Sequence, residues 1–212
     1  MNRRDHHTPS QLRIIAGQWR TRQLEFPDLP GLRPTPDRVR ETLFNWLAPV
    51  LPGARCLDLF AGSGALGIEA LSRGAAEVVL VEQHPVAVRA LHANLARLQA
   101  AHAQVEMADA LAWLRQPATP FDIVLLDPPF GQGLLEPVCA ALEAGGWLAD
   151  SSWIYLEAER DHTKLPLPTH WTLYREKVAG MVSYRLARRH APAADPIAGQ
   201  SRSHGCLAGD VF

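Results

Sequence analysis

The tetrapeptide Asp127-Pro128-Pro129-Phe130 offers the most specific chemistry in the sequence. It follows an apolar run, residues 121–126, that has the composition of a buried strand. The prolines fix φ and remove two backbone donors, so nearby carbonyl groups stay free to accept hydrogen bonds. These carbonyls and the Asp127 carboxylate can hold a planar amino group, and Phe130 can stack on the ring that carries it. On its own, the tetrapeptide is more simply explained as a turn after a strand.

A glycine turn upstream makes the chemical interpretation stronger. Gly62-Ser63-Gly64-Ala65-Leu66-Gly67 matches the pattern G-x-G-x-x-G between a predicted strand and a predicted helix. Asp58 precedes the turn, where it would repel a pyrophosphate at the helix N-terminus but attract a cationic ligand. S-adenosylmethionine carries an ammonium and a sulfonium group. The turn therefore favours this methyl donor, with an NAD(P)-dependent oxidoreductase as the alternative.

Two more acids follow apolar runs farther along the chain. Glu82 is placed to accept hydrogen bonds from ribose hydroxyls, and Asp109 from an adenine amino group, although Asp109 also suits a helix N-cap. Ligands bind outside the carboxyl ends of parallel strands, so these acids should line one crevice. The predicted cofactor-binding residues are Asp58, Phe60, Ala61, Gly62, Ser63, Gly64, Glu82, Gln83, Asp109, Ala110 and Asp127.

The elements that must position these residues alternate between strand and helix from residue 54 onward. Continuous apolar runs separated by amphipathic helices indicate an α/β fold, with a parallel sheet covered on both faces. An alternating pattern around Ala179-Gly180 predicts an antiparallel hairpin at one sheet edge. Predicted strands are 55–59, 77–81, 104–107, 121–126 and 153–157, and predicted helices are 64–73, 85–100, 111–114 and 134–144.

The N-terminal part is expected to be a basic extension of this sheet domain. Residues 12–16 and 23–26 are predicted as short strands, followed by a helix with Thr35 as its cap and Pro36 in its first position. The predicted division is a disordered N-terminus (1–11), a hairpin and helix extension (12–50), the main domain (51–190) and a disordered tail (191–212).

Composition excludes several classes of protein. With 212 residues, 47% hydrophobic and 20% charged, the chain has the composition of a soluble globular protein with one core. It has no apolar stretch near the ~18 residues of a membrane span, and no signal-peptide core. The three cysteines lack metal-type spacing. We expect a cytoplasmic monomer without a metal or a membrane contact.

Charge is distributed unevenly along the chain. Residues 1–40 carry eight arginines against four acids, for +4, and the remainder carries 13 basic and 18 acidic residues, for −5. Arginine suits bidentate phosphate contacts, so nucleic acid is the predicted partner, with a solvated basic arm as the alternative. The candidate RNA-binding residues are Arg13, Arg20, Arg33, Thr35, Arg38 and Arg40.

The combination of motifs resembles a known family. Segment 57–67 (LDLFAGSGALG) together with Asp127 to Phe130 is similar to the class I S-adenosylmethionine-dependent amino-methyltransferases. Segments 13–20 (RIIAGQWR), 32–47 (LRPTPDRVRETLFNWL) and 176–180 (EKVAG) narrow the resemblance to the RsmD family of bacterial 16S ribosomal RNA guanine-N2 methyltransferases. The resemblance covers residues 12 to 190. Gln83-His84 and the Ala/Gly-rich tail depart from the family pattern.

The resemblance implies a Rossmann-like, seven-stranded, mostly parallel sheet with an antiparallel C-terminal hairpin. It further implies that S-adenosylmethionine binds at Asp58 to Gly64, and that Asp127, Pro128, Pro129 and Phe130 hold a guanine of the small ribosomal subunit. Three alternatives remain open: an amino-methyltransferase acting on DNA adenine or protein glutamine, the NAD(P) oxidoreductase, and a non-catalytic RNA-binding module.

Overall fold

The structure, a computed structural model, describes residues 10–161 and 167–190. The disorder predicted for residues 1–11 was wrong at Ser10 and Gln11, which begin a strand. Its remainder, residues 1–9, and the predicted disordered tail at 191–212 lie outside these described residues. Within them, no helix is both long and apolar enough to cross a membrane.

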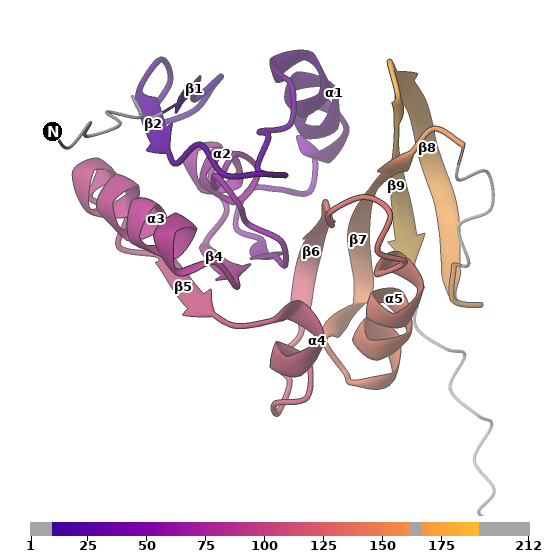
Figure 1. The fold of residues 1–212 in the computed structure, drawn as a ribbon. Coiled ribbons are helices and arrows are strands. Elements are labelled where there is room, and N and C mark those ends of the chain that lie inside the picture. The colour runs from indigo at the N-terminus through magenta and orange to yellow at the C-terminus, as the bar shows by residue number, and fades with distance from the viewer. Residues whose placement is uncertain (1–9, 162–166, 191–212) are drawn as a thin grey trace, which may run out of the picture.

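A seven-stranded sheet forms the centre of the molecule (Figure 1). Five neighbouring strands are parallel, and β9 pairs antiparallel with both β7 and β8, which confirms the predicted fold class. In spatial order the strands are β5 (Ala103–Met107), β4 (Glu77–Glu82), β3 (Arg55–Asp58), β6 (Phe121–Leu126), β7 (Leu148–Glu159), β9 (Val182–Arg189) and β8 (Trp171–Ala179).

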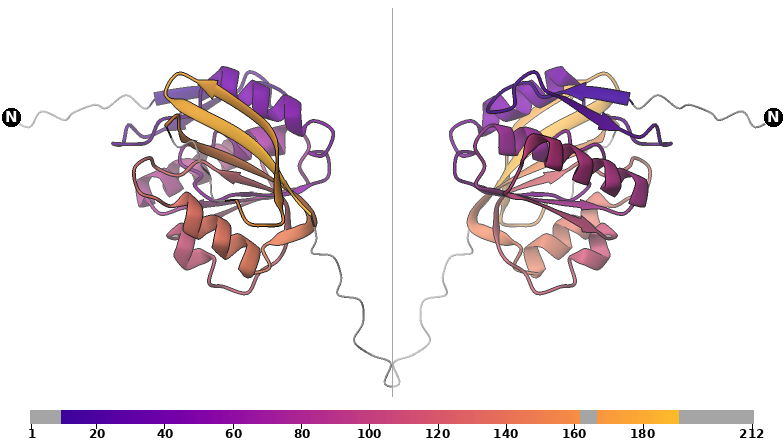
Figure 2. Two further views of the ribbon diagram at one scale, coloured as in Figure 1. Left: turned by 90° about the vertical axis from the view of Figure 1, so that its right-hand side faces the viewer. Right: turned by 90° about the vertical axis from the view of Figure 1, so that its left-hand side faces the viewer.

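Helices cover both faces of the sheet, so the middle residues of its central strands are apolar on both sides. One hydrophobic cluster joins the sheet to α1, α2 and α3 through residues such as Leu43, Ile68 and Leu91. The other joins it to α4 and α5 through Trp113 and Val138. The bounds are α1 (Asp37–Leu47), α2 (Gly67–Ser72), α3 (Pro85–Leu98), α4 (Ala110–Trp113) and α5 (Leu135–Ala144). In Figure 2, α3 and the β8–β9 hairpin lie at opposite edges.

The N-terminal hairpin consists of β1 (Ser10–Arg13) and β2 (Gln23–Phe26). The prediction of a strand over 12–16 was therefore wrong at both ends. Ile15 and Ala16 leave the strand because their backbone N–H groups donate to the Glu69 carboxylate in α2, at 2.8 and 3.0 Å. Glu69 lies more than fifty residues away, so no local pattern reveals this competition for the backbone donors.

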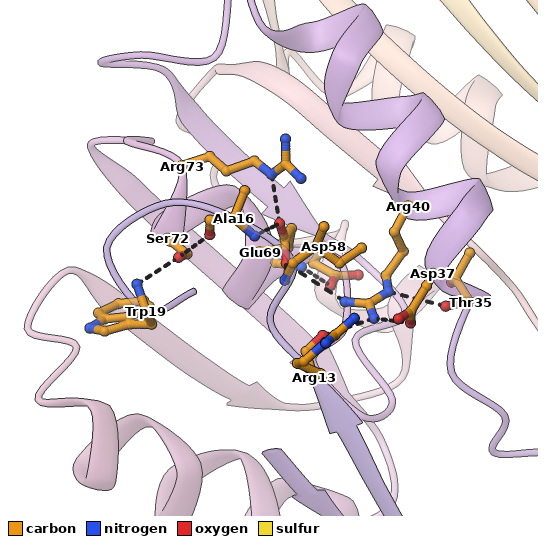
Figure 3. Close-up of polar contacts among 12 residues, drawn as sticks. Arg13, Ala16, Trp19, Thr35, Asp37, Arg40, Asp58, Glu69, Ser72 and Arg73 are labelled. Atoms are coloured by element: carbon orange, nitrogen blue, oxygen red, sulfur yellow. Dashed lines mark hydrogen bonds and ion pairs between the residues drawn. The ribbon is translucent and has the colours of Figure 1, made fainter. Parts of the chain in front are cut away.

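Gly17 fixes the hairpin loop against the C-terminal end of α2. Its φ is +83°, and a Cβ at this position would lie 1.8 Å from the Ser72 carbonyl oxygen. The loop is held by the Gln18 N–H, which donates to that oxygen at 2.7 Å, and by the Ser72 hydroxyl, which donates to Ala16. Trp19 is buried here beside Ser72 (Figure 3). The hairpin is thus attached to the sheet domain by specific polar contacts.

Two sheet-domain elements, β7 and α2, differ most from the predicted bounds. Strand β7 begins at Leu148, five residues earlier than predicted, because Leu148 pairs with Phe121 before a register shift. Helix α2 begins at Gly67 and not at residue 64. The residues before α2 form a tight turn, in which Gly62 and Gly64 have positive φ.

Candidate active site

The predicted crevice acids follow or end neighbouring parallel strands. Strand β3 ends at Asp58 and pairs with β4, which ends at Glu82, and with β6, which Asp127 follows. Burial raises the pKa of Asp58 to about 7, and the negative charges of Asp127 and Glu82 add to this rise. Because paired parallel strands end at the same edge of a sheet, the three acids lie along one edge.

The glycine turn is held by two of these acids. Gly62 N–H donates to Glu82 Oε2 at 2.9 Å, and Gly67 N–H donates to Asp58 Oδ2 at 2.8 Å. A Cβ on Gly64, whose φ is +80°, would lie 2.7 Å from Ile68 and Leu91 side-chain atoms. The turn can therefore adopt this path only with glycine at position 64.

One oxygen of Asp58 remains without a partner. Asp58 is 1% exposed, and its Oδ1 is a buried polar atom that accepts no hydrogen bond. A buried carboxylate oxygen without a donor is costly, so this atom marks a place where a donor or a cation would be stabilised.

Asp127 is held by a residue from the N-terminal extension. Thr35 Oγ1 donates to Asp127 Oδ2 at 3.0 Å; Thr35 is buried and Asp127 is half-buried. Burial raises the pKa of Asp127 to about 6, although the bond from Thr35 opposes this rise. The prediction that Thr35 caps α1 was wrong: Pro36 is the N-cap residue, and no side chain caps the helix. Because Thr35 is buried, it is also unsuited to contact RNA directly, as had been predicted for it.

The segment before α1 crosses the site from the glycine turn to Asp127. A Cβ added to Gly62 would lie 2.9 Å from Leu32 Cδ1, so Leu32 packs directly on the turn. Three residues later, Thr35 reaches Asp127. Residues 32–35, here called the crossing segment, thus contact both halves of the site.

Arg40 was predicted to contact RNA, and the structure contradicts this role. It is 0% exposed, and its guanidinium binds the carbonyl oxygens of Thr35 and Arg13 at 3.2 and 3.0 Å (Figure 3). It also pairs with Asp37 at 2.6 Å and lies 3.7 Å from a Glu69 carboxylate oxygen. Arg40 joins the hairpin, the crossing segment and α2. A buried arginine with these partners is a structural residue that holds Thr35 in place.

The tetrapeptide presents one buried and two exposed residues after Asp127. Pro128 is buried, whereas Pro129 is exposed and Phe130 is 45% exposed. The next residue, Gly131, donates its N–H to Glu159 Oε1 at 2.6 Å, which ties the loop to the end of β7. Phe130 is therefore an exposed ring on an anchored loop, as a stacking platform requires.

The adenosine side of the predicted site is more open. Asp109 caps α4, because its Oδ1 accepts a hydrogen bond from Ala112 N–H at 2.9 Å, so the capping alternative is confirmed. Its second oxygen is still able to accept another donor. Gln83 is exposed, whereas Ala110 is buried in the cluster under α4.

The other predicted RNA-binding residues lie on the surface. Arg13, Arg20, Arg33 and Arg38 are exposed and come from β1, the hairpin loop, the crossing segment and α1. In the described ranges, no group of three or more His, Cys, Asp or Glu side chains is arranged to hold a metal ion.

Sequence reasoning missed Glu157, at the end of β7. Glu157 is 4% exposed, and the Tyr155 hydroxyl donates to its Oε2 at 2.7 Å. Burial raises its pKa to about 8, and the charge of Asp127 adds to the rise. The available signal was the same one that selected the other acids, because Glu157 also ends an apolar run.

A doubly covered parallel sheet with a glycine turn after its first strand and acids at the following strand ends is the arrangement of Rossmann-like folds, a class that includes the methyltransferases. Comparisons with known proteins agree with this class. The model of the family described as Conserved hypothetical protein 95 matches residues 12–188. The chain belongs to this family.

Named relatives cover nearly the whole chain. Ribosomal RNA small subunit methyltransferase D of Escherichia coli strain K12 is 54% identical over 191 residues, or 90% of this chain and 96% of that protein. The protein of the same name from Haemophilus influenzae is 47% identical over 83% of this chain and 93% of its own length. A solved structure described as a putative methyltransferase, yhhF, from Escherichia coli has a TM-score of 0.82 and 53% identity, covering 86% of this chain and 100% of that one.

Proposed function

We propose that this protein transfers a methyl group from S-adenosylmethionine to the exocyclic N2 of a guanine in 16S ribosomal RNA. The observation that carries the proposal is the adjacency of Asp58 and Asp127 on paired strands, with the exposed ring of Phe130 beside them. The names of the relatives, which describe methyltransferases of small-subunit ribosomal RNA, point to the same substrate. This substrate places the reaction in the cytoplasm, where ribosomal subunits are assembled.

The residues around the glycine turn fit a ligand of the S-adenosylmethionine type. The orphaned Asp58 Oδ1 would accept a donor from its cationic methionine portion, and the turn at Gly62 to Gly64 would let its backbone approach closely. Glu82 and Asp109 keep acceptor capacity for ribose and adenine. Phe60, Ala61, Ser63, Gln83 and Ala110 complete the proposed cofactor site. The bound molecule supplies an activated methyl group on its sulfonium.

Asp127 and the Pro128 carbonyl would hold the guanine amine. Guanine N2 is a poor nucleophile because its lone pair is delocalised into the ring. Two acceptors for its two N–H bonds favour a more pyramidal nitrogen, with the lone pair directed at the methyl group. Positioning of this kind is worth about 7–11 kcal/mol in favourable cases. Asp127 therefore acts mainly by orientation, and Thr35 keeps its carboxylate in place.

Phe130 would hold the target base after it leaves its stack in the RNA. Stacking of a base on an aromatic ring contributes about 1–3 kcal/mol. The exposed arginines Arg13, Arg20, Arg33 and Arg38 would bind RNA phosphates, which positions the substrate without selecting a sequence. Selection of one guanine would then depend on the shape of the RNA around the pocket.

The decisive experiment is methyl transfer with the purified protein. Labelled S-adenosylmethionine and small subunits from a strain that lacks this activity are incubated with it, and the modified nucleotide is mapped by mass spectrometry. The expected product is one N2-methylguanosine in 16S RNA. Label found only in DNA adenine or in protein glutamine, or no transfer to subunits or free 16S RNA, would refute the proposal.

A further inference from the structure

One side of the C-terminal hairpin, β8 and β9, carries cations on the outer edge of the sheet. Strand β8 is the edge strand, and residues 172–178 are exposed (Figure 1). Its Arg175 pairs with Leu186 of β9, and two residues later Lys177 pairs with Tyr184. Directly paired residues share a face of the sheet, and both β9 residues belong to the hydrophobic cluster that contains α1. The two cations therefore lie on the α1 side of the hairpin.

Two arginines on this side stack on aromatic rings. The Arg175 guanidinium lies 4.9 Å from the centroid of the Tyr174 ring. The Arg188 guanidinium, from β9, lies 5.4 Å from the centroid of the Trp153 ring. The two rings pack edge to face with their centroids 5.0 Å apart, so the four side chains form one cluster. A stacked guanidinium has already lost part of its rotamer freedom, so it binds a ligand at a lower cost in conformational entropy.

Within the described residues, no carboxylate neutralises these cations. Arg175, Lys177 and Arg188 form no ion pair there. The acid of β8, Glu176, is on the other face of the strand, where it pairs with Arg185 at 2.6 Å. Charges on an edge strand also keep sheets from joining, but that purpose does not require aromatic rings beneath them. The arrangement fits a ligand with repeated negative charges.

The strand register places this surface beside the candidate active site. Lys177 pairs with Tyr184 of β9, which pairs with Glu157 of β7. Asp127 follows β6 at the same level, because the preceding residues of β6 and β7 are paired. Three strand spacings put Lys177 about 14 Å from Asp127 across the sheet. The surface is therefore within reach of groups near a base held at Asp127.

Helix α1 connects the C-terminal hairpin to an arginine already assigned to RNA. Trp46 of α1 stacks on Tyr184 of β9, with ring centroids 5.6 Å apart. Residues four apart share a helix face, so Arg38, Thr42 and Trp46 form one stripe along α1. Arg38 is exposed at the end of this stripe that follows the crossing segment. The stripe and the hairpin cations thus form one continuous surface.

We propose that the α1 side of the C-terminal hairpin is a second RNA-docking surface, in which Arg175, Lys177 and Arg188 bind phosphates near the target nucleotide. This inference rests on the proposed function, which makes 16S RNA the substrate. It adds a C-terminal element to an interface that the sequence assigned to N-terminal arginines alone. Phosphate contacts of this kind fix the orientation of the RNA relative to Asp127 without reading its sequence.

The test compares two variants that each lose two positive charges. R175Q/R188Q alters the hairpin surface. R89Q/R115Q is the matched control, because Arg89 on α3 and Arg115 after α4 are exposed, the first at the opposite edge of the sheet and the second beside the opposite face. The Kd for free 16S RNA and for small subunits is measured by filter binding at several salt concentrations.

The two variants should differ in both affinity and salt dependence. R175Q/R188Q should raise both Kd values about tenfold, and the slope of log K against log salt should fall by about 2, since each phosphate contact contributes about 1. The control pair should keep the wild-type Kd and slope. In steady-state kinetics, R175Q/R188Q should raise the KM for subunits about tenfold with little change in kcat, because neither arginine is near the reacting atoms. An unchanged Kd for S-adenosylmethionine shows that the variant is folded.

Tyr174 tests whether stacking prepares Arg175 for binding. Y174L keeps the charge of Arg175 but removes the ring beneath it, so the Kd for RNA should rise about two- to fivefold with an unchanged salt slope. Y174F keeps the ring and should bind RNA like wild type. Equal affinities of Y174L and Y174F would contradict this role of the ring.

Three results would overturn the proposal. The first is an R175Q/R188Q protein with the RNA affinity and salt slope of the control pair. The second is a higher Kd for subunits but not for free 16S RNA, which would assign the surface to a ribosomal protein. The third is a wild-type dimer in sedimentation that R175Q/R188Q dissociates without a change in RNA binding, which would assign it to a second copy of the chain. Because binding is measured apart from methyl transfer, it decides this inference even if wild-type protein transfers no methyl group, an outcome that would refute the proposed function alone.

Discussion

Binding of S-adenosylmethionine is expected to release protons near neutral pH. Burial raises the pKa of Asp58 in the unliganded protein to about 7, with contributions from the charges of Asp127 and Glu82. A cationic ligand beside the unpartnered Oδ1 would stabilise the ionised carboxylate. At pH 7 about half of the molecules carry a protonated Asp58, so binding should release about half a proton per site.

The effect of Asp58 on the stability of the unliganded protein follows from its pKa values in the unfolded and folded states. In the unfolded chain Asp58 has the ordinary value of 3.8, and the difference from about 7 corresponds to about 4 kcal/mol. Between about pH 4 and pH 7 the folded protein binds more protons at this site than the unfolded chain. The unliganded protein therefore loses stability as pH rises through this window, and the full loss is present above pH 7.

The affinity for the ligand changes with pH in the opposite direction from the stability of the unliganded protein. Since it binds the ionised form, its Kd should rise about fivefold from pH 7 to pH 6 and about tenfold per unit at lower pH. Isothermal titration calorimetry in buffers of different ionisation enthalpy measures both the Kd and the proton release. The window below pH 7 avoids titration of the ligand's own amine.

Two variants assign the released proton. Asp58→Asn should weaken binding and abolish the proton release that Asp58 contributes. Asp127→Asn should bind with a similar Kd, while its remaining release moves to lower pH, because the charge of Asp127 no longer raises the pKa of Asp58. Unchanged proton release in Asp58→Asn, or a wild-type Kd independent of pH between 5.5 and 7, would refute the reasoning.

Three further substitutions test other parts of the structure. Asp127→Ala should reduce single-turnover methyl transfer by orders of magnitude with little change in cofactor Kd, and equal losses in both would mean that its role is misassigned. Gly17→Ala should lower the free energy of unfolding by more than about 3 kcal/mol, because the new Cβ meets the Ser72 carbonyl. Gly31→Ala is its matched control, because Gly31 has the same φ of +83° but open space around it. Only about 1–2 kcal/mol of backbone strain is expected there. Similar losses of stability for the two variants in urea denaturation would contradict the steric argument. Arg40→Met should lower the free energy of unfolding by about 3–5 kcal/mol, because it leaves buried acceptors unpaired, and a thermal midpoint like that of wild type would contradict a structural role.

Local patterns predicted the central sheet well. The bounds of β6 agree with the predicted strand, and β3, β4 and β5 differ from prediction by one residue at one end. A strand that is covered on both faces is a continuous apolar run, so such runs between amphipathic helices predict the α/β fold class. The C-terminal hairpin was equally visible from its alternating pattern around Gly180.

Predictions failed where a distant polar side chain competes for local groups. Thr35 has the residue type and position of a helix cap, but its hydroxyl binds Asp127, ninety-two residues away. Ile15 and Ala16 look like strand residues, but Glu69 captures their N–H groups. Arg40 belongs to a basic N-terminal segment, yet its guanidinium lies in the interior. Each residue type allows both roles, and the pairing partner decides between them.

The order of residue types along the chain was sufficient to determine a sheet with acids at successive strand ends, a glycine turn and the position of the tetrapeptide after β6. These features depend on side-chain periodicity and on backbone conformations that few residues adopt, both of which are local properties. Tertiary structure alone decided that Thr35 and Arg40 support the site, that Asp58 keeps one oxygen without a donor, and that Glu157 stands beside Asp127. Those outcomes depend on which groups the fold buries together, because each of these residue types can bond either to local groups or to partners far away in the sequence.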